Sequence, residues 1–122
     1  MDDSTDQLDR AFGALADSTR RDLVARLAVS DATVGELAEP YDVSLQAISK
    51  HVKVLEEAGL VTRSRDAQRR PVHLNAGALD SMTTWIERYR REAEERYRRL
   101  DALLSRMAEG DDERPTDQED TP

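Results

Sequence analysis

The sequence contains no cysteine and few aromatic residues: one Trp, one Phe and three Tyr in 122 residues. Without cysteine the chain cannot form a disulfide, a thiolate metal site or a cysteine nucleophile. Only two histidines are present, His51 and His73, and they lie far apart in sequence. Two isolated histidines do not make a metal site, so we expect neither a metal nor a cofactor.

Long apolar runs are also absent, so the sequence predicts no membrane-spanning helix. The N-terminus is acidic and lacks the apolar stretch of a secretory signal. No glycine-rich phosphate loop and no nucleophile in a recognisable frame is present, which argues against an enzyme. The pattern is typical of a cytoplasmic protein without a membrane partner.

The charge of the chain is unevenly distributed. The formal net charge of −8 argues at first against a nucleic-acid partner. Residues 1–9 hold four Asp and no base, and residues 109–122 hold seven acids and one Arg, whereas residues 43–74 hold six bases and three acids. DNA binding depends on the local potential at the contact face, so the basic middle segment is compatible with it.

Apolar spacing predicts a mainly α protein with a small β-hairpin (α+β). Asp17 and Ser44 are suitable N-caps, Thr33 and Glu36 fit a capping box, and Gly59 suits a helix C-terminus. We expect helices over about 8–15, from 17 onward, over 33–39, 44–58 and 78–108, and a hairpin over 60–74. The acidic ends, 1–5 and 109–122, are expected to be disordered on either side of one domain over 6–108.

The short helix before Pro40, the tight turn over 41–43 and the helix from Ser44 have the spacing of a helix-turn-helix. The second helix of such a motif enters the DNA major groove with its N-terminal residues on base edges. Gln can pair with adenine, Lys can reach guanine or phosphate, and Ala can contact a thymine methyl group. The positions expected to face DNA are Ser44, Gln46, Ala47, Ser49, Lys50 and Lys53.

The hairpin over 60–74 would then be the wing of a winged helix-turn-helix. Its polar residues are expected to lie along the phosphate backbone or the minor groove; they are Arg63, Arg65, Gln68, Arg69 and Arg70. Because Pro71 cannot donate a hydrogen bond to a ladder, its strand is expected to be an edge strand. His73 is expected to be a cross-strand packing residue.

Four segments resemble the ArsR/SmtB family of transcription regulators. They are residues 14–21 (ALADSTRR), 34–38 (VGELA), 47–55 (AISKHVKVL) and 58–61 (AGLV). The resemblance covers roughly residues 8–108 and implies a winged-helix homodimer that represses transcription, often of its own operon. It also implies that His51 lies near the DNA, and that Arg20 and Arg21 contact a phosphate or form a salt bridge between helices. Without the resemblance, these two arginines would fit a solvated turn.

The sequence departs from the family pattern at the positions that sense metals. Residues 36–39 contain no cysteine where classical members carry a Cys-x-Cys pattern, and the long C-terminal helix contains no histidine. The chain therefore resembles the branch without metal ligands, and its effector is unknown. Leu45 stands where Gln is common in the family, so one family DNA contact is expected to be missing.

The predicted helix over 78–108 carries an apolar seam along its length. A helix of this length is too long for so small a domain to cover, which favours a partner helix from a second copy of the chain. The resemblance adds the first helix to this dimer interface. The expected interface residues are Leu8, Phe12, Leu79, Met82, Ile86, Tyr89, Ala93, Tyr97, Leu100 and Leu104.

Two functions from different classes fit these features. The first is a sequence-specific repressor that binds a pseudo-palindrome in double-stranded DNA as a homodimer. The second is a winged-helix module that binds another protein and has little affinity for DNA, for which the net charge of −8 is the main support.

Overall fold

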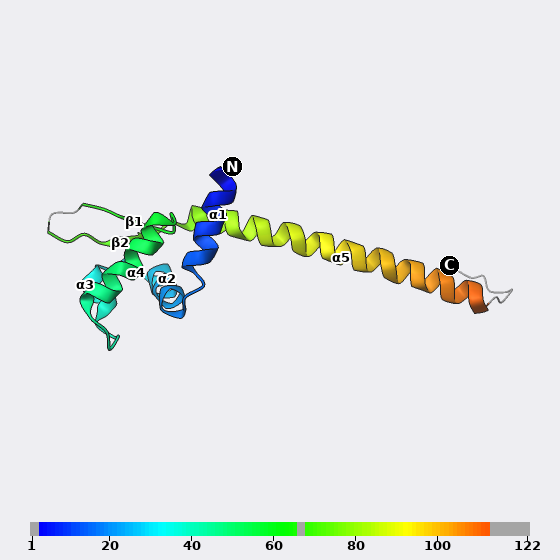
Figure 1. Ribbon diagram of the computed structural model, residues 1–122, viewed down its shortest axis with the longest axis horizontal. Coiled ribbons are helices and arrows are strands. Elements are labelled where there is room, and N and C mark those ends of the chain that lie inside the picture. The colour runs from blue at the N-terminus through cyan, green and yellow to red at the C-terminus, as the bar shows by residue number, and fades with distance from the viewer. Residues whose placement is uncertain (1–2, 66–67, 113–122) are drawn as a thin grey trace. The chain divides into compact units, whose positions relative to one another are not determined.

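The computed structural model describes residues 3–65 and 68–112. Its elements, labelled in Figure 1, follow in chain order: α1 (Asp3–Ala14), α2 (Ser18–Val29), α3 (Val34–Ala38), α4 (Leu45–Glu57), β1 (Val61–Arg63), β2 (Val72–Leu74) and α5 (Ala76–Asp112). The predicted order of helices and hairpin is confirmed. The chain divides into two units, residues 1–84 and residues 85–122.

The predicted caps begin three of the helices of the first unit. The Asp17 carboxylate accepts a hydrogen bond from the backbone N–H of Arg20, and the Ser44 hydroxyl accepts one from the N–H of Ala47. Thr33 and Glu36 form the expected capping box at the start of α3. Each cap satisfies backbone donors that have no partner within the helix, so these side chains define where α2, α3 and α4 begin.

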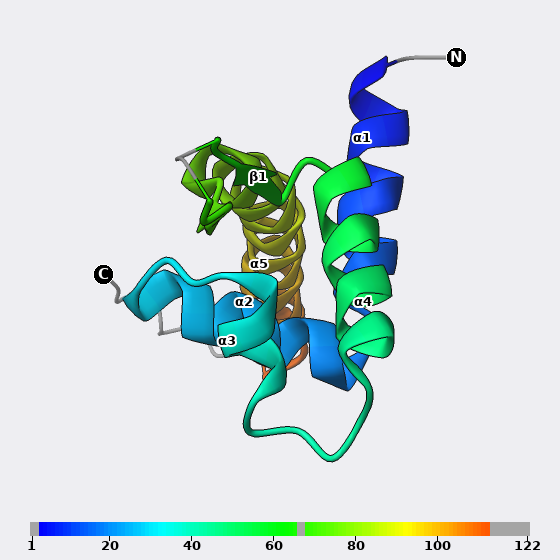
Figure 2. The same cartoon turned by 90° about the vertical axis from the view of Figure 1, so that its left-hand side faces the viewer.

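Apolar side chains from all seven elements form one core in the first unit, and α5 contributes to it through Met82. The most deeply buried members are Leu23, Leu37, Ile48, Val52, Leu55, Leu60, Val61 and Val72. Helix α4 packs against α1, α2, α3 and β1, and Figure 2 shows it beside α1. The core therefore holds α4 on one side and leaves its other side to solvent.

The wing is an antiparallel pair in which Val61 lies opposite Leu74 and Arg63 lies opposite Val72. Strand β2 is an edge of this two-stranded sheet, as predicted. At one position the N–H of Val72 donates to the carbonyl of Ala32 (2.7 Å), and the N–H of Ala32 donates to the carbonyl of Val72 (3.3 Å). This isolated bridge joins the wing to the segment between α2 and α3.

The two ends of the described chain are more ordered than the sequence suggests. Helix α1 begins at Asp3, so the expected disorder of residues 1–5 is wrong for residues 3–5. Helix α5 continues to Asp112 and does not end at residue 108. Gly110 does not stop it, because glycine destabilises a helix by only about 1 kcal/mol relative to alanine and keeps its backbone N–H donor. Residues 1–2 and 113–122 of the predicted tails lie outside the described residues.

Gly59 ends α4 in the left-handed conformation, with φ of 79°. We predict that Gly59→Ala lowers the free energy of unfolding by about 1–2 kcal/mol, because a Cβ strains this conformation. The added Cβ would also lie 2.5 Å from the amide nitrogen of Gln7. Urea unfolding followed by circular dichroism would measure the change.

Gly13→Ala is the matched control for this substitution. A Cβ at Gly13 would meet nothing within 4 Å, and Ala has the higher helix propensity, so stability should stay unchanged or rise by up to about 1 kcal/mol. Equal stability of Gly59→Ala and the wild-type protein would contradict the assignment of a conformational role to Gly59.

Candidate nucleic-acid interface

Helix α4 presents a polar face opposite its buried residues. Ile48, Val52 and Leu55 are buried, whereas Gln46, Lys50 and Lys53 are exposed. Of the other positions expected on this face, Ser44 is exposed, and Ala47 and Ser49 are half-buried. Within the described residues, neither Lys50 nor Lys53 takes part in an ion pair. Two uncompensated ammonium groups therefore project from the α4 surface.

His51 is half-buried and is held by the start of α2. Its Nδ1 lies 3.1 Å from a guanidinium nitrogen of Arg20, whose Nε donates to the carbonyl of Ala14 (2.6 Å). A guanidinium can only donate, so Nδ1 is the acceptor and the neutral ring carries its hydrogen on Nε2. Of the two roles open to Arg20, the structure shows the contact between helices. Whether His51 also reaches DNA stays a prediction.

The Asp17 carboxylate completes this junction between α2 and α4. It lies 3.9 Å from Nδ1 of His51. The hydrogen bond from the backbone N–H of Arg20 holds the pKa of Asp17 below its ordinary value, and the charge of Arg20 acts in the same direction. The carboxylate is therefore ionised at neutral pH and fixes the start of α2 beside the middle of α4.

The wing arginines differ in how far acidic neighbours already compensate them. The Nε of Arg63 lies 3.4 Å from Glu56 of α4, and this side chain is largely buried. Arg69 donates to both carboxylate oxygens of Glu36 of α3, at 3.0 Å each. Arg65, Gln68 and Arg70 are exposed. A phosphate would have to compete with Glu36 for Arg69, whereas Arg65 and Arg70 take part in no ion pair among the described residues.

A second network at the base of the wing has no counterpart in the sequence-based predictions. His73 lies opposite Thr62 in the hairpin, but its two ring nitrogens contact Asp31 (2.7 Å) and Ser64 (2.8 Å). The expectation of simple cross-strand packing was therefore incomplete. Asp31 and His73 are 42 positions apart, so no local sequence signal joins them.

The expected dimer residues fall into two groups. Leu8, Phe12 and Leu79 are half-buried against the core of the first unit, and Met82 belongs to that core, with 6% of its surface exposed. Its own chain therefore covers Met82, and a contact of Met82 with a second copy stays a prediction. The exposed members are Ile86, Tyr89, Ala93, Tyr97, Leu100 and Leu104.

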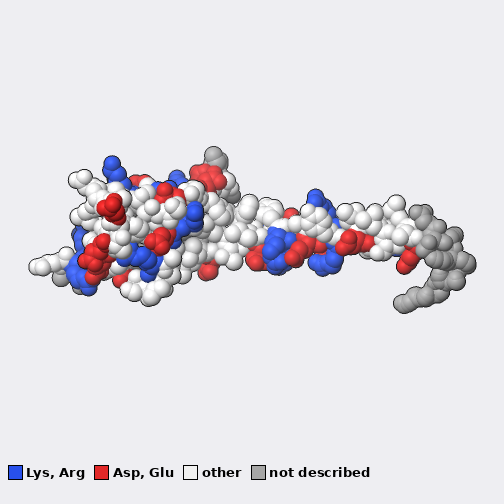
Figure 3. Space-filling model, turned by 90° about the horizontal axis from the view of Figure 1, so that it is seen from below, with Lys and Arg blue, Asp and Glu red and all other residues white. Residues whose placement is uncertain are grey.

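The second unit contains the exposed part of the seam and many ion pairs. Arg90 pairs with Glu87 and Glu94, and Arg88 pairs with Glu92. Figure 3 shows blue and red side chains next to one another on this stretch of α5. These pairs at helical spacing stabilise a solvated helix face.

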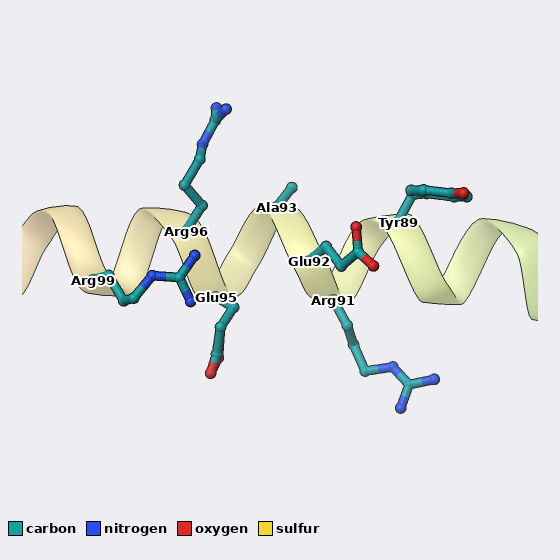
Figure 4. Close-up of a pocket in the computed structure, with 7 residues that line it drawn as sticks. All are labelled: Tyr89, Arg91, Glu92, Ala93, Glu95, Arg96 and Arg99. Atoms are coloured by element: carbon teal, nitrogen blue, oxygen red, sulfur yellow. The ribbon is translucent and has the colours of Figure 1, made fainter.

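A surface depression on α5 is lined by Tyr89, Arg91, Glu92, Ala93, Glu95, Arg96 and Arg99. All of these residues come from one helix. Figure 4 shows that Arg96 and Arg91 point to opposite sides of the helix. The side chains thus diverge, whereas a small-molecule site needs polar groups that converge on one ligand.

The described parts of the chain contain neither a metal-binding cluster nor a membrane-spanning helix. Among those residues, no group of three or more His, Cys, Asp or Glu side chains is arranged to hold a metal ion. No helix in the same residues combines the length and apolarity needed to cross a membrane.

A polar-faced α4 after a short α3, followed by a two-stranded wing, defines a winged helix-turn-helix protein. The family model described as "Helix-turn-helix domain" matches residues 15–64. The chain is 44% identical over 81 residues to the HTH-type transcriptional regulator Rv2034 of Mycobacterium tuberculosis, covering 66% of this chain and 76% of the relative. It is 30% identical over 79 residues to the transcriptional repressor SdpR of Bacillus subtilis, covering 65% and 88%.

The fold agrees with these sequence matches. The crystal structure of an ArsR family transcriptional regulator, RHA00566, superimposes with a TM-score of 0.68 at 33% identity, covering 72% of this chain and 97% of that chain. The chain belongs to the ArsR/SmtB family of winged helix-turn-helix transcription regulators. As a DNA-binding regulator of this family, it has no cysteine with which to form the classical metal-sensing motif.

The pair between Glu36 and Arg69 predicts how α3 and the wing respond to acid. The hydrogen bond from the N–H of Thr33 holds the pKa of Glu36 below its ordinary value of 4.5, and Arg69 lowers it further. A carboxyl group whose pKa is lowered by folding adds stability above its unfolded pKa, and this stability is lost as the pH falls through the folded pKa. We therefore expect the wild-type protein to lose stability as the pH falls from 5 to 3.

Glu36→Gln isolates this contribution, because the amide keeps an oxygen acceptor for the Thr33 N–H and removes the charge. The variant should be less stable than the wild type at pH 7, and the difference should shrink toward pH 3. Urea midpoints at several pH values measure both quantities. A difference that is independent of pH would exclude a charge effect at this position.

Proposed function

We propose that the protein is a homodimeric transcriptional repressor that binds a pseudo-palindromic operator. The single observation that carries this proposal is the exposed polar face of α4, where Gln46, Lys50 and Lys53 lie opposite the buried residues. In this motif the face enters the major groove, and two copies related by a dyad read half-sites about 34 Å apart. The name of SdpR, a transcriptional repressor, favours negative regulation.

In the proposed complex, α4 and the wing contact different parts of the DNA. The α4 face from Ser44 to Lys53 reads base edges, and the wing, through Arg65 and Arg70, holds phosphates. Arg69 joins the wing contacts when a phosphate displaces Glu36. Repression follows when the bound dimer blocks access of RNA polymerase to the promoter, which places the protein in the cytoplasm with its DNA.

Dimerisation is proposed through the exposed seam of α5. Large apolar side chains of the second unit lie 43–57% exposed: Trp85, Ile86, Tyr89, Tyr97, Leu100, Leu103, Leu104 and Met107. Burying such side chains is favourable by about 25 cal/mol per Å² of apolar area. A second copy of the same helix supplies a matching apolar surface, as isologous interfaces require.

The direct test is binding of the purified protein to DNA from upstream of its own gene, with scrambled DNA of equal length as the control, over a series of salt concentrations. Preference for the upstream fragment and protection of a pseudo-palindrome would support an autorepressor. Absence of binding at low salt would overturn the proposal and favour a module that binds another protein.

Lys50→Ala should weaken binding to the selected operator by about 5- to 150-fold, because a base contact contributes about 1–3 kcal/mol. If Lys50 instead contacts a phosphate, the slope of log K against log salt should fall by about 1. Fluorescence anisotropy titrations at several salt concentrations distinguish the two contacts.

Arg98→Ala on α5 is the matched control, because it also removes one positive charge but from the ion pair with Glu95. Its affinity should stay within about twofold of the wild type, since exposed ion pairs contribute little. Equal effects of Lys50→Ala and Arg98→Ala would mean that α4 has no special role in binding.

Leu100→Glu should shift the protein from dimer to monomer, because it places a charge in the apolar seam. Ala102→Glu adds the same charge two positions away, which is about 200° around the helix, and should leave the dimer intact. Sedimentation equilibrium of both variants measures the association directly. A Leu100→Glu protein that remains dimeric would contradict the proposed interface.

A further inference from the structure

Two apolar side chains at the start of α4, one in the helix and one just before it, are exposed to solvent. Leu45, the first residue of the helix, is 55% exposed, and Val43 in the preceding turn is 53% exposed. Between them, Ser44 uses its hydroxyl to cap the helix. The apolar pair is therefore displayed where the motif approaches bases most closely, although nothing in the core of the first unit requires it there.

Leu45 lies in line with the polar residues of the proposed reading face. Leu45, Ser49 and Lys53 are spaced by four positions, so they form one row along α4. Gln46 and Lys50 form the adjacent row by the same spacing. Leu45 thus continues the face that we propose to enter the major groove, with a hydrogen-bonding row beside it.

The chemistry of a leucine restricts what it can recognise on this face. It has no donor or acceptor, so it cannot pair with the polar edges of adenine, guanine or cytosine. The one apolar group on the major-groove edges of the four bases is the C5-methyl group of thymine. An aliphatic side chain gains by removing that methyl group from water.

We propose that Leu45 is a specificity-determining residue that contacts a thymine methyl group in each half-site of the operator. This inference rests on the proposed function, and it changes the expectation that Leu45 merely removes a family DNA contact. The operator of this protein therefore contains a T·A pair at the position that faces the start of α4.

The test begins with selection of binding sites by the full-length protein from a library of duplexes with a random core. Each conserved thymine of the selected sequence is then replaced by uracil, which removes only the C5-methyl group and keeps the same base pairing. At one position per half-site, uracil should weaken wild-type binding by about fourfold, the value of one buried methyl group.

Leu45→Ala connects this effect to the side chain. The variant should bind the thymine operator more weakly than the wild type and should bind the thymine and uracil operators within twofold of each other. Val29→Ala is the matched control, because Val29 is an apolar residue that is 87% exposed at the end of α2. It should retain both the wild-type affinity and the fourfold effect of uracil.

The outcomes separate the inference from the function on which it rests. A protein that selects a defined sequence but tolerates uracil at every thymine, or a Leu45→Ala variant that keeps the fourfold effect, overturns the inference and leaves the regulator intact. Selection of no sequence at all overturns the proposed function, and the role of Leu45 in it.

Discussion

The burial of one side of α4 is the constraint on which the rest of the structure depends. Ile48, Val52 and Leu55 are fully buried, and each such side chain contributes about 1.5–3 kcal/mol relative to an exposed one. That burial fixes the rotation of the helix about its axis. Gln46, Lys50 and Leu45 must then face solvent, so the same packing that stabilises the fold also orients the reading face.

Ion pairs within the first unit decide which arginines of the wing are available to bind DNA phosphates. Glu56 and Glu36 compensate Arg63 and Arg69, whereas Lys50 and Lys53 have no ionic partner among the described residues. A net charge of −8 is therefore compatible with a locally positive patch around Lys50 and Lys53 of α4. Because counterion release depends on the charges that actually meet phosphates, the number of arginines in the wing overstates its contribution to affinity.

The second unit is stabilised in a different way from the first. Its charged faces are stabilised by pairs at i,i+3 and i,i+4 spacing, such as Arg90 with Glu87 and Glu94. Its apolar residues, by contrast, have nothing in the described chain that covers them fully. A helix of this kind depends on association for most of its stability. The length of α5 is therefore explained by the proposed dimer.

The sequence by itself determined the order of the elements, the helix starts at Asp17, Thr33 and Ser44, and the turn at Gly59, because caps and left-handed glycines act through neighbours within a few residues. It also predicted the exposed face of α4, because helical periodicity separates apolar from polar positions. Only the tertiary structure decided that Met82 is buried, that Ala32 bridges to Val72, and that Arg69 and His73 are paired with Glu36 and Asp31. These contacts join residues more than 30 positions apart, and no local pattern specifies which distant side chain the fold brings within reach.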